Sequence, residues 1–344
     1  MFWVRPASTP VYAQPLISVL LPFRNAVATL DDAISSVLAD MRAADELVLV
    51  DDGSTDGSPA MAESHARDPR VRLVTTPGLG LPGALARGVE VCRGALVARM
   101  DADDVSLPGR FAAQEALLAG DPALGAVATL VEPFGDPGPG MRRYLAWQNG
   151  LITREDHARA IFIEAPICHP TVMLRRAALD EVGGFRAGDF AEDYDLWLRL
   201  IAAGWGIAKV PEVLFRYRVH RASMTWSDPR FTPEKLRQLR ALHLSKKLDR
   251  PFALWGAGAC GRRLARELET HGHRPQSFID IDPKKIGRTA RSRSIVAMNE
   301  GIARARQGDL LIIVGVGAAG ARELIRERLN ADAWVEGRDY FFAA

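Results

Sequence analysis

Short apolar runs alternate with helix-like segments along residues 16–100, and this alternation constrains the fold more than any other feature of the chain. "LISVLLPF" (16–23) has the leucine, isoleucine and valine content of a buried strand, and "LDDAISSVLADM" (30–41) has apolar residues at helical spacing. Further strands are expected in "ELVLVDDGSTDGS", "RVRLVTT" and "ALVARM". Continuous apolar strands separated by helices are typical of a doubly wound α/β sheet, which binds its ligands at the carboxyl ends of the strands.

A second α/β pattern begins at Pro251, after a polar helical stretch. It has its own strands, among them "FALWG" and "DLLIIVGV", and its own glycine-rich turns. With 344 residues the chain is long enough for two domains, and we predict a smaller Rossmann-like α/β domain after the first. The expected divisions are an N-terminal arm (1–15), a first domain (16–230), a linker helix (231–250) and a second domain (251–344).

Composition argues against several classes of protein and site. The formal charge of +2 does not suit a broad nucleic-acid-binding surface. The three cysteines lie far apart without CxxC spacing, which argues against a zinc site or a disulfide framework and fits a reducing cytosol. No apolar run approaches the ~20 residues of a membrane span, and residues 1–15 lack the apolar core of a signal peptide. We expect a cytoplasmic protein without a membrane span, and peripheral association with a membrane surface stays open.

Acidic residues gather at the ends of two predicted strands. Asp101, Asp103 and Asp104 directly follow "ALVARM", and Asp51 and Asp52 follow "ELVLV". Carboxylates packed this closely repel one another unless a cation is present. Mg²⁺ and Mn²⁺ prefer oxygen ligands and usually bind one or two carboxylates together with substrate phosphates. The alternative is that Asp103 or Asp104 only caps the following turn, but their place at a strand end favours a metal.

Six motifs stand in one order between roughly residues 15 and 225. They are "LISVLLPFRNA", "VLVDDGSTDGS", "ARMDADDVSLPGRF", "CHPTVMLRRAALDEVGGF", "AEDYDLWLRL" and "FRYRVHRASMT". In this order and spacing they resemble the motifs of the inverting GT-A glycosyltransferases, glycosyltransferase family 2. The resemblance implies a GT-A doubly wound mixed sheet. It also implies transfer of a sugar from a nucleoside diphosphate to an acceptor hydroxyl, with a divalent metal and inversion at the anomeric carbon.

The resemblance assigns the donor side of the site residue by residue. Pro22 and Asn25 match the family's P-x-x-N at the start of the loop that covers the nucleotide. Asp52 matches the position that hydrogen-bonds the base, where a carboxylate can accept the N–H of uracil. Asp101 and Asp103 match the D-x-D, with Asp103 the expected direct metal ligand and Asp101 nearer the ribose or sugar. The implied donor is a UDP-sugar, with dTDP- and GDP-sugars as alternatives, and the acceptor is a glycan or its lipid-linked precursor.

The stretch "FAEDYDLW" supplies the acceptor side of the site. Asp193 matches the family's catalytic base, which takes the proton of the acceptor hydroxyl, and Glu192 is expected beside it to help bind donor or acceptor. Asp195 is expected on the helix surface. The alternative for all three is an acidic first turn that interacts with the helix dipole.

Histidines and arginines complete the implied site. His220 matches a position that in some family members completes the metal or diphosphate site, and the alternative is an exposed loop histidine. Arg216, Arg218 and Arg221 are expected to interact with phosphate charge. His169 is expected to hold the acceptor loop, and the other five histidines are predicted at the surface.

A glycine fingerprint marks the second domain. "GAGACG" follows an apolar strand and opens a helix, so Gly256, Gly258 and Gly261 are candidates for nucleotide binding, with Asp280 at the next strand end as a candidate ribose ligand. The segment resembles the small Rossmann-like domains appended to some glycosyltransferases and sugar acyltransferases. A bound NAD or other nucleotide and a structural or acceptor-related role both stay open.

Two rival functions belong to other classes. One is a nucleotide-sugar oxidoreductase built on the "GAGACG" domain, although no Tyr-x-x-x-K pair follows to supply the usual acid. The other is a non-catalytic sugar-nucleotide-binding module, against which the intact acidic motifs argue.

Overall fold

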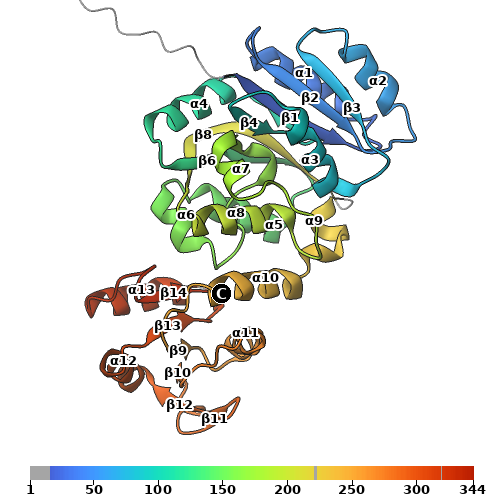
Figure 1. Cartoon of the computed structure of the whole chain (residues 1–344). Helices are drawn as coiled ribbons and strands as arrows, with labels where there is room; N and C mark the ends of the chain where they lie inside the picture. Colours follow the sequence, from blue (N-terminus) through green and yellow to red (C-terminus); the bar gives the residue numbers. More distant parts are fainter. Residues whose placement is uncertain (1–15, 221–222, 319) are drawn as a thin grey trace, which may run out of the picture.

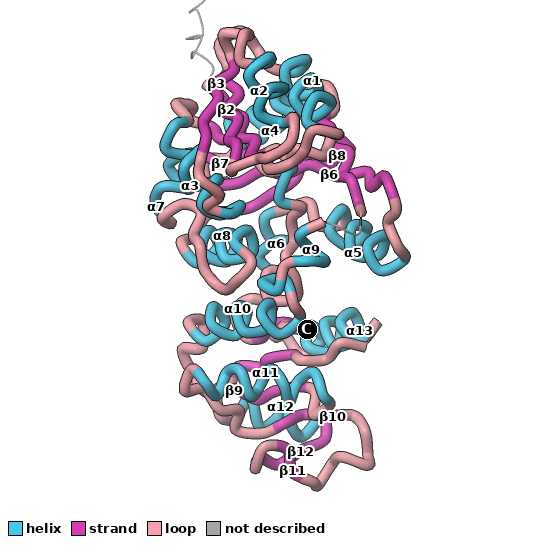
Figure 2. The backbone as a smooth tube through the Cα atoms, turned by 90° about the vertical axis from the view of Figure 1, so that its right-hand side faces the viewer, coloured by secondary structure: helices cyan, strands magenta, loops and turns pink. Residues whose placement is uncertain are grey.

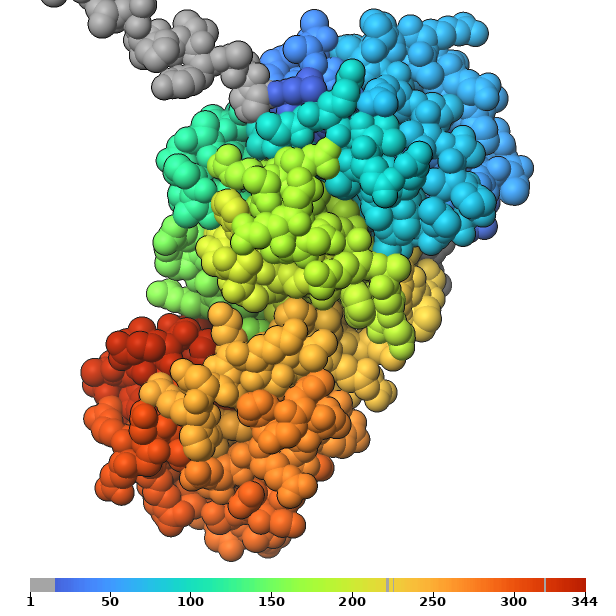
Figure 3. Space-filling model, viewed as in Figure 1, coloured from blue at the N-terminus to red at the C-terminus, as the bar shows by residue number. Residues whose placement is uncertain are grey.

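The computed structural model describes residues 16–220, 223–318 and 320–344, which form two α/β domains (Figure 1). The expected N-terminal arm, residues 1–15, lies outside the described residues. The first domain contains an eight-stranded sheet and the second a six-stranded sheet. Helix α10 (Pro233–Ser245) lies at the boundary, where the two domains are in contact (Figure 3).

The first sheet is mixed. Its strands are β1 (Ile17–Phe23), β2 (Glu46–Asp51), β3 (Val71–Thr75), β4 (Leu96–Arg99), β5 (Val105–Ser106), β6 (Leu124–Gly135), β7 (Met173–Arg175) and β8 (Gly206–Val219). Their spatial order is β3-β2-β1-β4-β7-β6-β8-β5. The first four in this order are parallel, β7 is antiparallel to both of its neighbours, and β8 runs parallel to β6.

Helices cover both faces of this sheet. They are α1 (Leu30–Asp40), α2 (Ser58–His65), α3 (Gly80–Val91), α4 (Arg110–Gly120), α5 (Pro139–Asn149), α6 (Arg154–Ala160), α7 (Arg176–Glu181), α8 (Glu192–Ala202) and α9 (Met224–Ser227), with short 3₁₀ turns η1 (His169–Thr171) and η2 (Pro229–Phe231). α1 and α2 lie on one side and α3 and α7 on the other (Figure 2). Every residue of β1, β2 and β4 is therefore buried, as their continuous apolar runs predict.

The register brings the carboxyl ends of the parallel strands to one edge of the sheet. Phe23, the last residue of β1, is paired with Asp51, the last residue of β2. Leu20 is paired with Arg99, the last residue of β4. The acidic residues that follow β2 and β4 in the sequence therefore meet at this edge.

Two segments after Gly120 differ from the prediction. "VEPFGDPGPGM" is predicted as a loop, but its first half extends β6 to Gly135, paired with β8, and α5 begins at Pro139. The helix predicted over "LITREDHARAIFIE" ends at Ala160. Beyond the end of the helix, Phe162 packs edge-to-face against Phe341 of the second domain, with ring centroids 6.1 Å apart.

The second sheet is parallel except at one edge. Its elements are β9 (Phe252–Trp255), α11 (Ala259–Thr270), β10 (Phe278–Asp280), β11 (Thr289–Ala290), β12 (Arg293–Ala297), α12 (Met298–Gln307), β13 (Leu311–Val314), α13 (Ala321–Ala331) and β14 (Tyr340–Phe342). The order is β11-β12-β10-β9-β13-β14, with only β11 antiparallel to its neighbour. Among the helices of the described ranges, none has both the length and the apolar character that crossing a bilayer requires.

The surface predictions for Asp195 and for two of the histidines are wrong. Asp195 is 6% exposed, accepts a hydrogen bond from Arg199 Nε at 2.7 Å, and lies 3.4 Å from Nε2 of His243 on α10. His243 is 7% exposed and His157, on α6, is fully buried. The sequence shows the acidic residues of α8, but it does not show that α10 packs over them. Asp195 therefore ties the first domain to the boundary helix.

We expect Asp195→Ala to destabilise the protein by about 3 kcal/mol, because removing one member of a buried ion pair leaves its partner uncompensated. Urea denaturation measures this change as a lower free energy of unfolding. Asp180→Ala is the matched control, because Asp180 is an exposed partner of Arg176 at 3.9 Å. A loss of less than about 0.5 kcal/mol in both variants would show that the Asp195 pair does not stabilise the fold.

Candidate active site

A cavity of about 1060 Å³ opens at the carboxyl ends of the parallel strands of the first domain. Its wall is built from the ends of β1 and β4, the residue after β2, the first turn of α8 and the end of β8. The residues predicted to bind the nucleotide, hold the metal or act as the base all line the cavity: Pro22, Asn25, Asp52, Asp101, Asp103, Glu192, Asp193 and His220. The fold thus brings the strand-end carboxylates and the acidic helix turn into one space.

Asn25 and Asp52 shape the wall beyond β1 and β2. Asn25 has a left-handed backbone (φ 52°), which asparagine tolerates better than most side chains, and its Oδ1 accepts a hydrogen bond from Thr55 N at 2.7 Å. The Asp52 carboxylate accepts three hydrogen bonds of 2.6–2.8 Å from the turn at 76–80. Asp52 therefore holds this turn against the cavity, next to the space where a base is predicted to bind.

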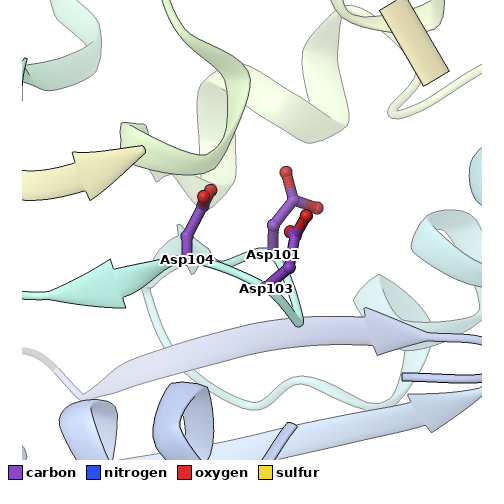
Figure 4. Close-up of side chains that lie close together, drawn as sticks. All are labelled: Asp101, Asp103 and Asp104. Carbon is purple, nitrogen blue, oxygen red and sulfur yellow. The ribbon is translucent and has the colours of Figure 1, made fainter. Parts of the chain in front are cut away.

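Three carboxylates cluster in the turn after β4. Figure 4 shows Asp101 and Asp103 side by side, with Asp104 rising from the other end of the turn. One oxygen from each lies within 4.8 Å of the others. Asp104 is 1% exposed, and its Oδ1 accepts a hydrogen bond from the N–H of Arg218 on β8 at 2.7 Å. Burial, together with the charges of Asp101 and Asp103, raises the pKa of Asp104 well above its usual value.

Arg99 lies beside this cluster, at the end of β4. It is 2% exposed and forms an ion pair with Asp101. Burial raises the pKa of Asp101, Arg99 opposes the rise, and the charge of Asp103 adds to it. Arg110 also interacts electrostatically with Asp104, and Arg218 lies against Asp103, so arginines partly balance the charge of the three carboxylates.

His220 approaches the cluster from the end of β8. Its Nε2 lies 3.0 Å from Oδ2 of Asp103, and the neighbouring Arg218 donates from Nε to the Asp103 carbonyl at 2.7 Å. Arg216 points elsewhere and lies 3.4 Å from Glu132. Arg221 lies outside the described residues. Of the three arginines predicted to interact with phosphate, Arg218 is thus the one that lines the cavity in the described part of the chain.

The first turn of α8 forms the opposite part of the wall. Glu192 is 1% exposed and accepts a hydrogen bond from Arg230 Nη1 at 2.9 Å. Nδ1 of His169 lies 4.0 Å from its other oxygen. The buried Glu192 is therefore held in place by a cation from η2.

Asp193 lies next to Glu192 and lines the cavity. Its Oδ1 accepts a hydrogen bond from the N–H of Tyr194 at 2.7 Å. Burial, and after it the charge of Glu192, raises the pKa of Asp193 to about 7. A carboxylate that changes protonation near neutral pH is well matched to proton transfer.

A second cavity, of about 810 Å³, lies at the carboxyl ends of β9, β10 and β13. Gly256, Gly258 and Asp280 line it, and a Cβ on Gly258 would meet nothing within 4 Å. Gly261 instead packs beneath the turn, because a Cβ there would lie 1.9 Å from Gly256 O. Asp280 accepts hydrogen bonds from two backbone N–H groups (2.9 Å each) and from Lys285 Nζ (3.2 Å), so its carboxylate already braces the turn. Nucleotide binding here stays a prediction.

Comparison with known proteins decides the family. Residues 18–183 match the model of glycosyl transferase family 2. The amylovoran biosynthesis glycosyltransferase AmsE of Erwinia amylovora is 32% identical over 207 residues, which cover 59% of this chain and 76% of AmsE. The chain belongs to glycosyltransferase family 2. The resemblance of the six motifs is thereby confirmed, and the chain is a glycosyltransferase.

Solved structures show the fold of this glycosyltransferase. The S. aureus TarS fragment 1–349 in complex with UDP-GlcNAc is 17% identical, with a TM-score of 0.55, and the match covers 74% of this chain and 72% of TarS. The mannosyltransferase PcManGT of Pyrobaculum calidifontis, in complex with GDP-Man and Mn²⁺, is 19% identical, with a TM-score of 0.50, over 96% of this chain and 84% of that chain. The expected GT-A fold is confirmed, with a second mixed sheet in a separate domain.

Sequence reasoning missed two cations of this glycosyltransferase: Arg99, which lines the cavity, and Arg230, which holds Glu192. The sequence does contain a sign of the role of Arg99, because it is the one charged residue in the apolar run "ALVARM". Nothing in the sequence points to Arg230, because its partner Glu192 lies 38 residues earlier in the chain.

Proposed function

We propose that this glycosyltransferase moves a sugar from a nucleoside diphosphate sugar to an acceptor hydroxyl, with a divalent metal and with inversion at the anomeric carbon. One observation carries the proposal: a single cavity holds the strand-end carboxylates Asp101 and Asp103 together with Asp193, whose pKa is raised to about 7. An inverting displacement needs a base on the far side of the sugar from the leaving diphosphate, and a group that stabilises the charge of that diphosphate.

Asp101, Asp103 and His220 fit a divalent cation. The carboxylates of Asp101 and Asp103 suit Mn²⁺ or Mg²⁺, and one oxygen from each of Asp101, Asp103 and Asp104 lies within 4.8 Å of the others, close enough to share one cation. A bound cation supplies charge stabilisation at the leaving diphosphate. PcManGT, solved with GDP-Man and Mn²⁺, supports this assignment. Asp103 and His220 would hold the cation, and Asp101 would lie nearer the ribose or sugar.

Asp193 is the proposed base, and it takes the proton of the acceptor hydroxyl. Burial raises the pKa of Glu192 and its ion pair with Arg230 opposes the rise, while the charge of Glu192 raises the pKa of Asp193. Asp195 is unsuited to this role because its carboxylate is committed to Arg199 and His243. Asp193 lines the cavity, its pKa is raised to about 7, and its neighbour Glu192 is held by Arg230, so we assign the base to Asp193.

The donor we propose is a UDP-sugar bound by Pro22, Asn25 and Asp52, with a GDP-sugar as the alternative. TarS was solved with UDP-GlcNAc and PcManGT with GDP-Man, so the neighbours support a nucleotide sugar of either base. AmsE acts in amylovoran biosynthesis, which supports a glycan or its lipid-linked precursor as the acceptor. The comparisons do not favour the rival oxidoreductase.

The rate of sugar transfer should depend on pH through Asp193. The base works only as a carboxylate, and its pKa is raised to about 7, so kcat/KM should fall about tenfold for each pH unit below 7 and level off above it. Initial rates between pH 5 and 9, at saturating Mn²⁺, measure the profile. A flat profile between pH 5 and 7 would exclude Asp193 as a base with this pKa.

A thermal-shift panel tests the donor class. The full chain is melted with UDP, GDP, UDP-glucose, UDP-GlcNAc, GDP-mannose and NADH, each with and without Mn²⁺. We expect stabilisation by one nucleoside diphosphate and its sugars, and only with Mn²⁺, because ligands that bind the folded state raise its melting temperature. Stabilisation by NADH alone would favour the oxidoreductase. Stabilisation by nucleotide sugars without any transfer or hydrolysis would favour the binding module.

A further inference from the structure

Several buried atoms of cavity-lining side chains have no hydrogen-bond partner among the described residues. They include Nε of Arg99, a residue that is 2% exposed, Nε2 of His169, which is 8% exposed, and Oε1 of Gln148; Nη1 of Arg99 has none either but forms the ion pair with Asp101. Native structures leave few buried polar atoms without a partner, because the desolvation of such atoms is not compensated. The donors among them, on Arg99 and His169, indicate groups that a ligand satisfies.

Both side chains are held rigidly. The Arg99 side chain forms an ion pair with Asp101, and its backbone at the end of β4 accepts a hydrogen bond from the fully buried Arg110 at 2.7 Å. The His169 ring packs against Phe185 and Trp197, with ring centroids 5.6 Å and 5.8 Å away. Donors fixed in this way are preorganised for a ligand and lose little freedom when it binds.

The positions of the two residues indicate which part of the donor they meet. Arg99 is paired with Asp101 on the metal side and also interacts electrostatically with Glu192 on the base side. Nδ1 of His169 lies 4.0 Å from Glu192, next to Asp193 in the sequence. In an inverting displacement the transferred sugar lies between the diphosphate and the base. Arg99 and His169 therefore border the space of that sugar.

We propose that Arg99 Nε and His169 Nε2 form hydrogen bonds with hydroxyl groups of the transferred sugar, and that this pair selects an uncharged sugar. The proposal deepens the proposed function and rests on it. The charge of Arg99 is already balanced by Asp101. A hydroxyl offers Arg99 Nε an acceptor without new charge, whereas a uronic acid would add a carboxylate beside Asp101, Asp103 and Glu192.

Comparing the affinity for the bare nucleotide with the affinity for the nucleotide sugar distinguishes hydrogen bonding to the sugar from a purely structural role of Arg99 and His169. The full chain, Arg99→Lys and His169→Phe are titrated with UDP, UDP-glucose, UDP-GlcNAc, UDP-glucuronic acid, GDP and GDP-mannose, all with Mn²⁺. Lysine keeps the ion pair with Asp101 but lacks the Nε–H group, and phenylalanine keeps the ring packing of His169. Each variant should bind the preferred neutral sugar nucleotide about 3- to 10-fold more weakly, the effect of one lost hydrogen bond, and bind the bare nucleotide as the wild type does.

Matched controls are Arg87→Lys and His271→Phe, at exposed positions outside the cavity, and they should leave every affinity unchanged. An equal loss for nucleotide and sugar nucleotide, or no loss, would overturn the proposal. Tighter binding of UDP-glucuronic acid than of UDP-glucose by the wild type would overturn the selection of an uncharged sugar. If the wild type binds none of the ligands with Mn²⁺, the proposed function fails and this inference fails with it. Should Arg99→Lys not fold, His169→Phe and His169→Asn carry the same test.

Discussion

Asp193→Asn is expected to lower the turnover of sugar transfer by about 10²- to 10⁴-fold while the donor binds with unchanged affinity. Asparagine has the size of aspartate, and its amide oxygen can still accept the 2.7 Å hydrogen bond from Tyr194 N, so the α8 turn should keep its shape. It cannot take the proton of the acceptor hydroxyl. Initial rates give kcat, and calorimetric titration of the donor with Mn²⁺ gives the affinity.

Asp189→Asn is the matched control, because Asp189 precedes the same helix, is 72% exposed and is paired with Lys235. It should leave both kcat and donor affinity near the wild-type values. A weaker donor affinity with near-normal turnover in Asp193→Asn would instead give Glu192 the role of base. The structure leaves Glu192 as the alternative on this turn, because Asp195 is held by Arg199.

The strand-end part of the site could be predicted because local sequence determines it. Parallel strands that are buried along their whole length end at the same edge of the sheet, so the residues directly after β2 and β4 must converge there. The positions of Asp52, Asp101 and Asp103 in one cavity follow from this rule together with the motif order.

The parts that could not be predicted depend on contacts between distant segments. Glu192 and Arg230 are 38 residues apart and Asp195 and His243 are 48 apart, and no periodic pattern links such pairs. The acidic character of its own turn therefore predicts a surface position for Asp195. The helix that covers it, α10, reads as a polar linker in the sequence because only part of it is buried.

The glycine fingerprint shows a further limit of sequence reasoning. Gly258 and Gly261 belong to one motif, yet a Cβ on Gly258 would face open space and a Cβ on Gly261 would meet the backbone of Gly256. One glycine thus borders a cavity and the other allows close packing of α11. Spacing alone identifies the strand–turn–helix unit, but it does not separate glycines that can meet a ligand from glycines that the fold itself requires.

Asp103→Asn is expected to abolish the Mn²⁺-dependent part of donor binding, a loss of at least about 100-fold. Removing a residue that only hydrogen-bonds to a metal ligand lowers metal affinity by about 10- to 100-fold, so removing a direct ligand should lower the affinity further. The side chain is 34% exposed at the cavity, so asparagine fits without repacking. Donor titrations over a range of Mn²⁺ concentrations measure the effect. Asp136→Asn, at an exposed position outside the cavity, is the control and should bind as the wild type does.

Melting temperatures distinguish a metal ligand from a residue that only shapes the turn. The charge of Asp103 raises the pKa values of Asp101 and Asp104, which means that the three carboxylates repel one another when no cation is bound. At pH 8 in EDTA, Asp103→Asn should therefore melt at the same temperature as the wild type or higher, whereas added Mn²⁺ should stabilise the wild type and not the variant. A turn-shaping role would instead make the variant melt lower in EDTA and leave the Mn²⁺ shift unchanged, and that result would remove Asp103 from the metal site.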